Sequence, residues 1–234
     1  SKKAKDLLYG FAEKQLKSLN ESIEKRGVAT LNPILEVGDF SEKIIESSEK
    51  LNVNILFAGA GEKLGDNIPL LGSNAVKIIK KSNKPVFIVK NDSPLNINKI
   101  LCPIDFSLES KRALKNAITL AHKFNAEIII LNVYDLSDLF PIRNKIKMDE
   151  HLEYLQKNCE NELNEFLKDF TYTGLNVTKE IKQGKPSTEI LKALKRHAID
   201  LLIMVTTRKY GINKILIGSV TDKVIKEITS SSIT

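Results

Sequence analysis

The sequence predicts an α/β fold in which strands alternate with helices and one unit is written twice. Short apolar runs of strand length, such as residues 127–133 and 199–205, are separated by segments whose apolar residues recur every three or four positions. Corresponding residues of the two halves stand a constant 146 positions apart, as Gly72 and Gly218 do. Strands that alternate with helices predict a parallel sheet that right-handed crossovers cover on both faces.

The first half begins with an amphipathic helix over residues 1–25, which Gly27 ends. One face of this helix is apolar and carries Leu8, Ala12, Leu16, Leu19 and Ile23. The pattern then predicts a short strand at 31–37, a helix that opens at Ser41, a strand at 54–58, a helix after Gly72-Ser73 and a strand at 85–89.

The second half begins at Lys99, after a polar linker that holds Pro94. A strand is predicted at 100–104, and Ser107 is expected to cap the helix that follows. The half continues with a strand at 127–133, a helix that includes Leu152 and Phe166, a strand at 177–181, a helix that starts within 184–187, a strand at 199–205 and a helix after Gly218-Ser219.

The offset also predicts what each half lacks. The counterpart of the strand at 100–104 would precede residue 1, so we expect the first half to lack its opening strand, first helix and second strand. Because Pro85 corresponds to Ser231, the second half is expected to stop inside its last strand. We therefore expect domains at 1–91 and 99–234, joined by a linker at 92–98, with the chain truncated at both ends.

Composition narrows the class of protein. The net charge is +7, but lysines are spread along the chain and aromatic residues make up only 6%, which argues against nucleic-acid binding. No apolar run approaches the length of a membrane span, and no leader pattern is visible. Cys102 and Cys159 are expected to be buried thiols of a reducing, cytoplasmic compartment.

Catalytic and metal chemistry find little support in the residue pattern. His122, His151 and His197 show no ligand spacing to one another, so no metal site is predicted. No Ser–His–Asp or Cys–His arrangement can be argued, so nucleophilic catalysis is not predicted either. At most, a weak ATPase activity would fit.

A ligand crevice is predicted at one end of the sheet. Five strands per unit suit the flavodoxin-like order 3-2-1-4-5, whose crevice lies outside the carboxyl ends of strands 1 and 4. In the second half those ends carry Asp105 and the loop from Val205 to Ile217. The loop leads into Gly218-Ser219 at a helix start, where free backbone N–H groups can hold a phosphate.

At these residues the chain resembles the universal stress protein family in its tandem, two-domain form. The matching stretches are KILCPIDFS at 99–107, IIILNVYD at 128–135, ILIGSVTDKVIKEI at 215–228 and LLGSNAVKIIKKSNKPVFIV at 70–89. The resemblance implies two tandem flavodoxin-like domains of the adenine nucleotide alpha hydrolase-like type, each with three layers and a parallel five-stranded sheet. It also implies that the two domains pack as an intrachain pseudo-dimer, as single-domain relatives do through their last strands; a homodimer is a further option.

The resemblance implies an adenine-nucleotide pocket, with ATP and Mg²⁺ or AMP as the ligand. Asp105 would bond the base or ribose, the Val133 backbone would meet adenine, and the amides of 218–220 would hold phosphates. The matching positions are Pro103, Asp105, Val133, Met204, Gly218, Ser219 and Val220.

The phosphate motif departs from the family pattern, which has Gly, two residues, Gly, nine residues, then Gly-Ser or Gly-Thr. In the second half Val205 and Arg208 stand at the first two glycine positions. We expect Val205 to be the worse replacement, because β-branched residues rarely tolerate positive φ. In the first half Gly59, Gly72 and Ser73 match, but Glu62 replaces the second glycine and would repel phosphate.

These observations leave two functions open. The first is a regulatory or protective universal stress protein that does no catalysis, whose degenerate pockets bind no nucleotide and whose protein partner is unknown. The second is an ATP-binding member in which the nucleotide gates partner binding or is slowly hydrolysed. For Gly218-Ser219 the simpler interpretation is a helix start with a serine cap, and for Asp105 a strand-end residue that caps the next helix.

Overall fold

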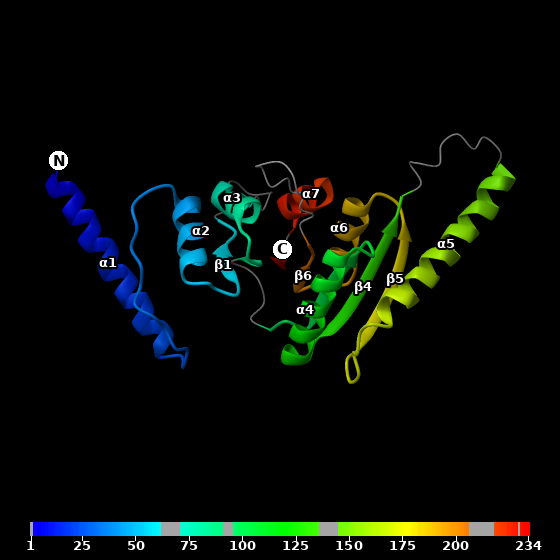
Figure 1. Cartoon of the computed structure of the whole chain (residues 1–234), viewed down its shortest axis with the longest axis horizontal. Coiled ribbons are helices and arrows are strands. Elements are labelled where there is room, and N and C mark those ends of the chain that lie inside the picture. The colour runs from blue at the N-terminus through cyan, green and yellow to red at the C-terminus, as the bar shows by residue number, and fades with distance from the viewer. Residues whose placement is uncertain (1, 62–70, 91–95, 136–144, 206–217, 229) are drawn as a thin grey trace. The chain divides into compact units, whose positions relative to one another are not determined.

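The chain divides into two compact units, Ser1–Ser47 and Ser48–Thr234. The computed structural model describes residues 2–61, 71–90, 96–135, 145–205, 218–228 and 230–234. The colours of Figure 1 follow the chain from the N-terminus in blue to the C-terminus in red.

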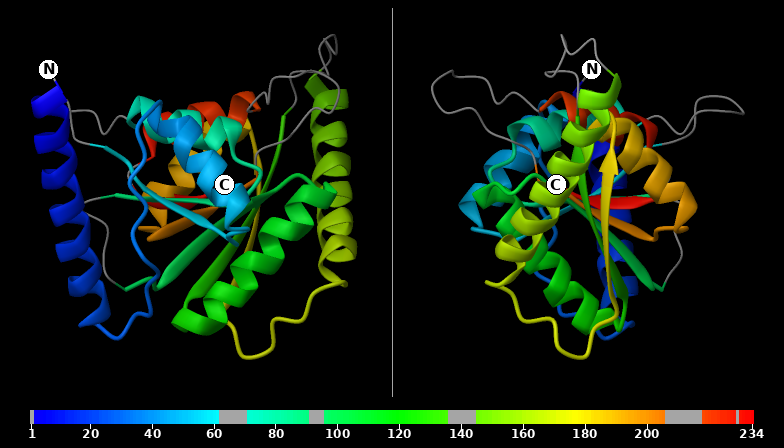
Figure 2. Two further views of the ribbon diagram at one scale, coloured as in Figure 1. Left: turned by 60° about the vertical axis from the view of Figure 1, so that its left-hand side comes forward. Right: turned by 90° about the vertical axis from the view of Figure 1, so that its right-hand side faces the viewer.

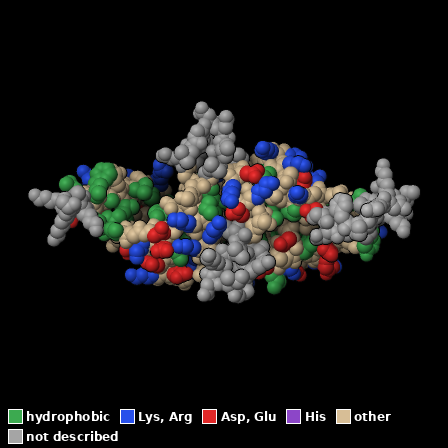
Figure 3. Space-filling view, turned by 90° about the horizontal axis from the view of Figure 1, so that it is seen from above, with side chains coloured by type: hydrophobic (Ala, Val, Ile, Leu, Met, Phe, Trp, Pro, Cys, Tyr) green, Lys and Arg blue, Asp and Glu red, His purple; other side chains and the backbone are tan. Residues whose placement is uncertain are grey.

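The first unit consists of one long helix, an extended segment and most of a second helix. Helix α1 (Lys2–Glu24) confirms the predicted amphipathic helix, and Gly27 follows it at a φ of 80°. Leu7, Leu8 and Phe11 of α1 are exposed, and hydrophobic side chains gather over this helix in Figure 3. Helix α2 (Phe40–Lys50) starts one residue before Ser41, and the Asp39 carboxylate accepts a hydrogen bond from the N–H of Glu42.

The predicted strand at 31–37 is wrong, because these residues form no strand. Their counterparts 146 positions later form β5 (Val177–Gln183), which pairs along its whole length with β4 (Glu127–Tyr134). Among the described residues of the first unit no strand offers such a pairing. A segment with strand-like sequence stays irregular when its backbone groups have no neighbouring strand to bond.

The second unit is built around a seven-stranded sheet, which the two views in Figure 2 show from different sides. Its other strands are β1 (Leu56–Gly59), β2 (Val86–Val89), β3 (Lys99–Ile104), β6 (Leu201–Ile203) and β7 (Ser231–Ile233). Its helices are the end of α2, α3 (Ser73–Lys81), α4 (Leu108–Phe124), α5 (Lys145–Leu167), α6 (Pro186–Arg196) and α7 (Ser219–Glu227).

The strands lie in the order β1-β2-β7-β6-β3-β4-β5. Counted along the second half, the last five follow the predicted order 3-2-1-4-5 and are all parallel. Strand β2 joins them antiparallel, with Phe87 opposite Ile233 and Ile88 opposite Ser232. The expectation of separate five-stranded sheets is therefore corrected to one continuous sheet of seven.

Helices cover both faces of the sheet. Leu114 of α4 and Phe166 of α5 pack with Ile100 and Ile130 on one face. On the other face Ile190 of α6 and Val224 of α7 pack with residues that alternate with these, such as Leu131. The central residues of β3 and β4, at 100–104 and 128–131, are all apolar because both faces of these strands are covered.

The offset of 146 relates backbone features as well as residues. Helices α2 and α6 have 11 residues each and α3 and α7 have 9 each, and each pair starts 146 positions apart. Asn52 and Ala198, also 146 apart, both adopt left-handed backbone, with φ of 47° and 50°. Left-handed backbone is uncommon for residues other than glycine, so its recurrence at corresponding positions is specific.

The two cysteines differ in burial. Cys102 on β3 is fully buried, as predicted, and burial raises the pKa of its thiol to about 12. Cys159 on α5 is only partly buried, and its pKa is raised by burial and by the nearby Glu162. Cys102 is thus an inert core thiol at neutral pH.

Candidate functional site: a cavity at the carboxyl ends of the strands

A cavity of about 620 Å³ lies where β3, β4 and β6 end and where α6 and α7 begin. This is the switch point of the 3-2-1-4-5 order, where the sequence predicts the crevice. Most of its walls are apolar, and Asp105, Ser110, Ser219 and Thr221 are the polar residues on its surface. The lining residues are Pro103, Ile104, Asp105, Ser110, Leu131, Val133, Pro186, Ile190, Met204, Val205, Gly218, Ser219, Val220 and Thr221.

All seven residues that the sequence singled out as candidates for the second half line this one cavity. Pro103 lies on β3 and Asp105 directly follows it, while Val133 lies on β4 and Met204 directly follows β6. Gly218 is the residue before α7, and Ser219 and Val220 begin that helix. Gly59, Gly72 and Ser73 belong to the first half and do not line it. Arg208 and Glu62 lie outside the described residues.

Sequence reasoning missed six other lining residues, one of which is Ile104 at the end of β3. Leu131 stands two positions before Val133 on β4 and therefore faces the same side of the sheet. Pro186 and Ile190 belong to the first turns of α6, and Thr221 to the first turn of α7. Ser110 follows the predicted cap Ser107 by three positions, which could have placed it in the same helical turn.

One carboxylate oxygen of Asp105 accepts hydrogen bonds from neighbouring residues, whereas the other accepts none from the described residues. Its Oδ1 accepts hydrogen bonds from the N–H of Ser107 at 3.1 Å and from the hydroxyls of Ser107 and Ser110. The Ser110 hydroxyl accepts in turn from the N–H of Asp105. Among the described residues no donor reaches Oδ2 of this exposed side chain, so one oxygen supports the helix start while the other is open to a ligand.

Two opposing influences set the pKa of Asp105. Partial burial is the largest single influence and raises it, but the hydroxyls of Ser107 and Ser110 and the N–H of Ser107 stabilise the carboxylate and together outweigh burial. The pKa therefore lies below its ordinary value, and Asp105 is ionised at neutral pH. An ionised Asp105 accepts hydrogen bonds from hydroxyl or amino groups and repels phosphate.

The helix that follows Asp105 starts as predicted. Ser107 is the N-cap of α4, and its side chain accepts from the N–H of Ser110 at 3.1 Å. Phe106, between the aspartate and the cap, has a φ of 61°. This left-handed residue turns the chain so that the Asp105 carboxylate can fold back onto the first turn of α4.

The start of α7 differs from the simple capped helix that the sequence allowed. Gly218 is the N-cap, so Ser219 is the first helical residue, and no side chain of the described residues accepts a hydrogen bond at this cap. The serine-cap interpretation is therefore wrong. An uncapped N-terminus leaves backbone N–H groups without an internal acceptor, and these are the groups that hold anions.

The backbone conformation of Val205 differs from the expected one, which was a positive φ at the first glycine position of the phosphate motif. Its φ is not positive, and neither is that of Gly59 at the corresponding position of the first half. A Cβ placed on Gly59 would meet no atom within 4 Å. The Val205 side chain packs on the α4 face of the sheet, and its carbonyl accepts from the Thr221 hydroxyl at 3.1 Å. The argument from positive φ is thus wrong for this residue.

The first half keeps tight glycine packing at the equivalent place. Gly61 has a φ of 89°, and a Cβ there would lie 3.3 Å from the Cα of Gly72. The N–H of Gly72 donates to the carbonyl of Ala60 at 2.7 Å. Gly72 is the N-cap of α3 and has no side-chain cap, as at Gly218.

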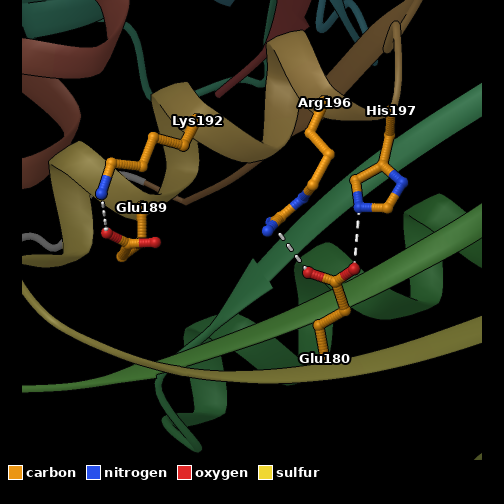
Figure 4. A network of polar contacts seen from close by, with 5 residues as sticks. All are labelled: Glu180, Glu189, Lys192, Arg196 and His197. Atoms are coloured by element: carbon orange, nitrogen blue, oxygen red, sulfur yellow. Dashed lines mark hydrogen bonds and ion pairs between the residues drawn. The ribbon is translucent and has the colours of Figure 1, made fainter.

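Helix α6, which brings Pro186 and Ile190 to the cavity, is held to β5 at its other end. Figure 4 shows Glu180 of β5 between two side chains at the end of α6. Arg196 Nη2 lies 3.0 Å from one carboxylate oxygen, and His197 Nε2 lies 2.8 Å from the other. Within the first turns of α6, Lys192 pairs with Glu189 at 2.8 Å.

The described residues were also searched for a metal-binding cluster and for a membrane-spanning helix. No three His, Cys, Asp or Glu side chains of the described residues gather as a metal ion would require. None of the described helices is both long and apolar enough to cross a bilayer. On the face seen in Figure 3, Lys and Arg side chains lie among Asp and Glu side chains.

Sequence comparisons identify the class of protein that this fold and cavity define. The family model described as the universal stress protein family matches residues 96–231. Universal stress protein MJ0531 of Methanocaldococcus jannaschii is 32% identical over 139 residues, which cover 59% of this chain and 81% of that protein. Universal stress protein MJ0577 of the same organism is 32% identical over 143 residues, or 55% of this chain and 88% of that protein.

The chain belongs to the universal stress protein family. Its fold is similar to that of a universal stress protein from Archaeoglobus fulgidus, with a TM-score of 0.69 at 22% identity over 97% of this chain and 79% of the other. The solved structure of MJ0577 aligns with 59% of this chain and with 94% of the MJ0577 chain, with a TM-score of 0.52 at 29% identity.

Proposed function

We propose that this chain is a tandem universal stress protein with a regulatory or protective role, and that it acts by binding an adenine nucleotide in the cavity beside Asp105. The observation that carries the proposal is the convergence of all seven candidate residues on one cavity of about 620 Å³. That volume lies within the range typical of small-molecule sites. Binding would serve as a signal to a partner, without turnover of a metabolite.

Two observations support the tandem organisation. The helices and left-handed residues of the two halves recur at the same offset of 146 positions, as Asn52 and Ala198 do. The fold similarity to the Archaeoglobus fulgidus protein extends over 97% of this chain, well beyond residues 96–231. We accordingly propose domains at 1–91 and 99–234, with β2 and β7 joining them in an intrachain pseudo-dimer.

The chemistry of the walls supports an adenine nucleotide as ligand. Leu131, Val133 and Met204 form apolar surface suited to a flat base. Oδ2 of Asp105 suits a ribose hydroxyl or an amino group, because its negative charge would repel a phosphate. The phosphates would then lie at the uncapped start of α7, at Gly218 and Ser219.

The competing hypothesis is an interaction module whose pocket binds no nucleotide. It is favoured by the loss of two motif glycines, at Val205 and Arg208. In a glycine-rich phosphate-binding loop the backbone approaches the phosphate closely, and side chains at the glycine positions hinder this approach. Against this, Val205 directs its side chain to the α4 face of the sheet and has no positive φ that glycine would relieve.

Thermal denaturation with ATP, AMP and Mg²⁺ separates the two hypotheses. Ligand at a hundred times its Kd should stabilise the native protein by about 2.7 kcal/mol, a visible rise in Tm. Asp105→Asn should reduce this rise, whereas Glu227→Gln, the same charge change at the far end of α7, should not. Val205→Gly should not improve binding. Absence of any shift with millimolar ATP or AMP would remove the nucleotide and leave the interaction module.

A further inference from the structure

Strand β4 carries one buried carboxamide among aliphatic side chains. Asn132 is 4% exposed and directly follows the aliphatic run at 128–131. Burying a carboxamide costs free energy unless its nitrogen and its oxygen both find hydrogen-bond partners. Packing therefore does not explain an asparagine at this position, and its polar contacts must do so.

The Asn132 side chain lies on the face of the sheet that is opposite the cavity. Successive residues of a strand point to opposite faces, so Asn132 shares its face with Ile130. Ile130 packs in the core beneath α4 and α5, whereas Leu131 and Val133 line the cavity. Asn132 does not belong to the cavity wall, so it can act on a ligand only through a neighbouring residue.

That neighbour is the end of β3. Asn132 lies opposite Ile104 in the parallel register of β3 and β4, and its Nδ2 donates to the Ile104 carbonyl at 3.1 Å. Ile104 is the last residue of β3, and its carbonyl belongs to the planar peptide that leads into Asp105. The hydrogen bond therefore fixes the peptide from which Asp105 leaves the sheet.

The end of β3 needs this anchor because its main-chain pairing is incomplete there. Pro103 has no N–H and cannot donate to a neighbouring strand. The pairing of β3 with β6 covers only Ile100 and Leu101, whereas its pairing with β4 continues to Ile104. Asn132 thus supplies a side-chain donor at the point where β6 no longer holds the strand.

Only half of the Asn132 carboxamide is paired. Its Oδ1 is buried and has no hydrogen-bond partner among the described residues. A buried unpaired carbonyl destabilises the native state, because unfolding would let it bind water. Departures of this kind from a fully satisfied core gather at functional sites. The contact with the peptide before Asp105 connects this departure to the cavity.

We propose that Asn132 is a positioning residue for the nucleotide site, which holds the peptide before Asp105 so that the carboxylate is already in place when the ligand arrives. The inference rests on the proposed binding of an adenine nucleotide. Asn132 touches no ligand atom and acts through Asp105 alone. Because the carboxylate is ordered beforehand, less conformational entropy is lost on binding.

A double-mutant cycle on the full chain tests this coupling. Isothermal titration calorimetry measures the Kd of AMP and of ATP with Mg²⁺. Asn132→Leu removes the donor from the Ile104 carbonyl and should raise Kd about tenfold. Asp105→Ala should also raise Kd. The double variant should match Asp105→Ala within about twofold, because Asn132 then has no carboxylate to position.

The matched control changes the same face of the same strand. Ile130→Val removes one methylene from the core two residues before Asn132, so it should lower Tm but leave Kd within about twofold. Asn132→Leu should show the opposite pattern, with weaker binding and no larger loss of Tm than the control. Asn132→Ala removes the same donor and replaces Asn132→Leu if that variant fails to fold.

A second readout needs no nucleotide. Partial burial raises the pKa of the Asp105 carboxyl, but its hydrogen bonds from Ser107 and Ser110 hold the pKa below its ordinary value. In Asn132→Leu a less ordered carboxylate should bond these donors less well, so its pKa should rise in an NMR titration of the free protein. Ile130→Val should leave this pKa unchanged.

The two readouts separate failure of the inference from failure of the proposed function. If neither nucleotide binds the wild type, the proposed function is wrong, and the titration still decides whether Asn132 orders Asp105. An unchanged Asp105 pKa in Asn132→Leu would overturn the proposal. So would additive losses in the cycle, with the double variant about tenfold weaker than Asp105→Ala, because Asn132 would then act independently of Asp105.

Discussion

At the scale of single residues, Asp105 links the fold to the cavity. One oxygen of its carboxylate accepts from Ser107 and Ser110, while the other has no partner among the described residues. The left-handed Phe106 makes this geometry accessible. Both interpretations that the sequence allowed for Asp105 are thus compatible with the structure: support of the next helix, and an acceptor for a ligand.

The lowered pKa of Asp105 predicts an effect of pH on stability. A carboxylate with a lowered folded pKa stabilises the native state above its unfolded pKa of about 4, and this contribution is lost as pH falls through the folded value. Asp105→Asn should therefore be less stable than the wild type at pH 6. Urea unfolding at pH 6 and at pH 3 should show that this difference shrinks in acid; a constant difference would contradict the assignment.

Residue types alone could predict where Asp105 and Ser107 lie, because strand ends and helix caps have strong local signals. They could not predict the backbone at Val205. The sequence suggested a positive φ there by analogy with glycine, but φ depends on how the end of β6 packs. The sequence also could not predict that the helix start at Gly218 has no side-chain cap, because the serine that follows Gly218 suggests a serine cap.

At the scale of elements, the helices and buried strands were predictable because their apolar periodicity is strong. Strand β4, with its run of isoleucines, and helix α4, with its cap and apolar face, are found close to their predicted bounds. The segment at 31–37 was not predictable in the same way. Its pattern favours a strand, but a strand forms only where a neighbour supplies hydrogen bonds.

Helix α4 offers a test of how the core supports the site. Leu114 is fully buried between α4 and the sheet, on the helix whose first turn holds Asp105. Leu114→Ala should lower the free energy of unfolding by about 2–5 kcal/mol, through lost burial and a residual cavity.

The neighbouring exposed Lys115 provides the matched control for that substitution. Lys115→Ala should change the free energy of unfolding by less than about 0.5 kcal/mol. Urea denaturation gives both values, and a loss below about 1 kcal/mol for Leu114→Ala would mean that α4 packs less closely than described.

At the scale of the whole second unit, one sheet joins strands β1 and β2 to the five strands of residues 99–234. The strand order of the second half followed from the alternation of strands and helices, so it could be predicted. The antiparallel pairing of β2 with β7 was expected only through the family resemblance. No local pattern encodes it, because pairing between distant strands depends on the complete fold.

A designed disulfide tests this join. Phe87 and Ile233 face each other between β2 and β7, and the flanking pair Val86 and Thr234 exchanges backbone hydrogen bonds at 2.9 and 3.0 Å. Phe87 and Ile233 therefore form a pair without such bonds, whose Cα atoms lie about 4.5 Å apart. Phe87→Cys with Ile233→Cys should form a disulfide under mild oxidation, detected by mass spectrometry of the linked peptides.

The control moves one cysteine two residues along β7, to Ser231 on the same face. The diagonal separation is then about 7–8 Å, beyond the reach of a disulfide. Phe87→Cys with Ser231→Cys should stay reduced under the same conditions. Efficient linkage of the control pair in place of the first would contradict the observed register.

The reversal of strand direction between β2 and β7 has an electrostatic consequence for α3 and α7. Each helix runs opposite to the strand before it, so the macrodipoles of these two helices point in opposite senses. Lys80, in the last turn of α3, lies 3.8 Å from Asp222, in the first turn of α7. The positive pole of one helix thus lies near the negative pole of the other, and their fields partly cancel. Lys80 of α3 thereby contributes to the charge balance at the N-terminus of α7.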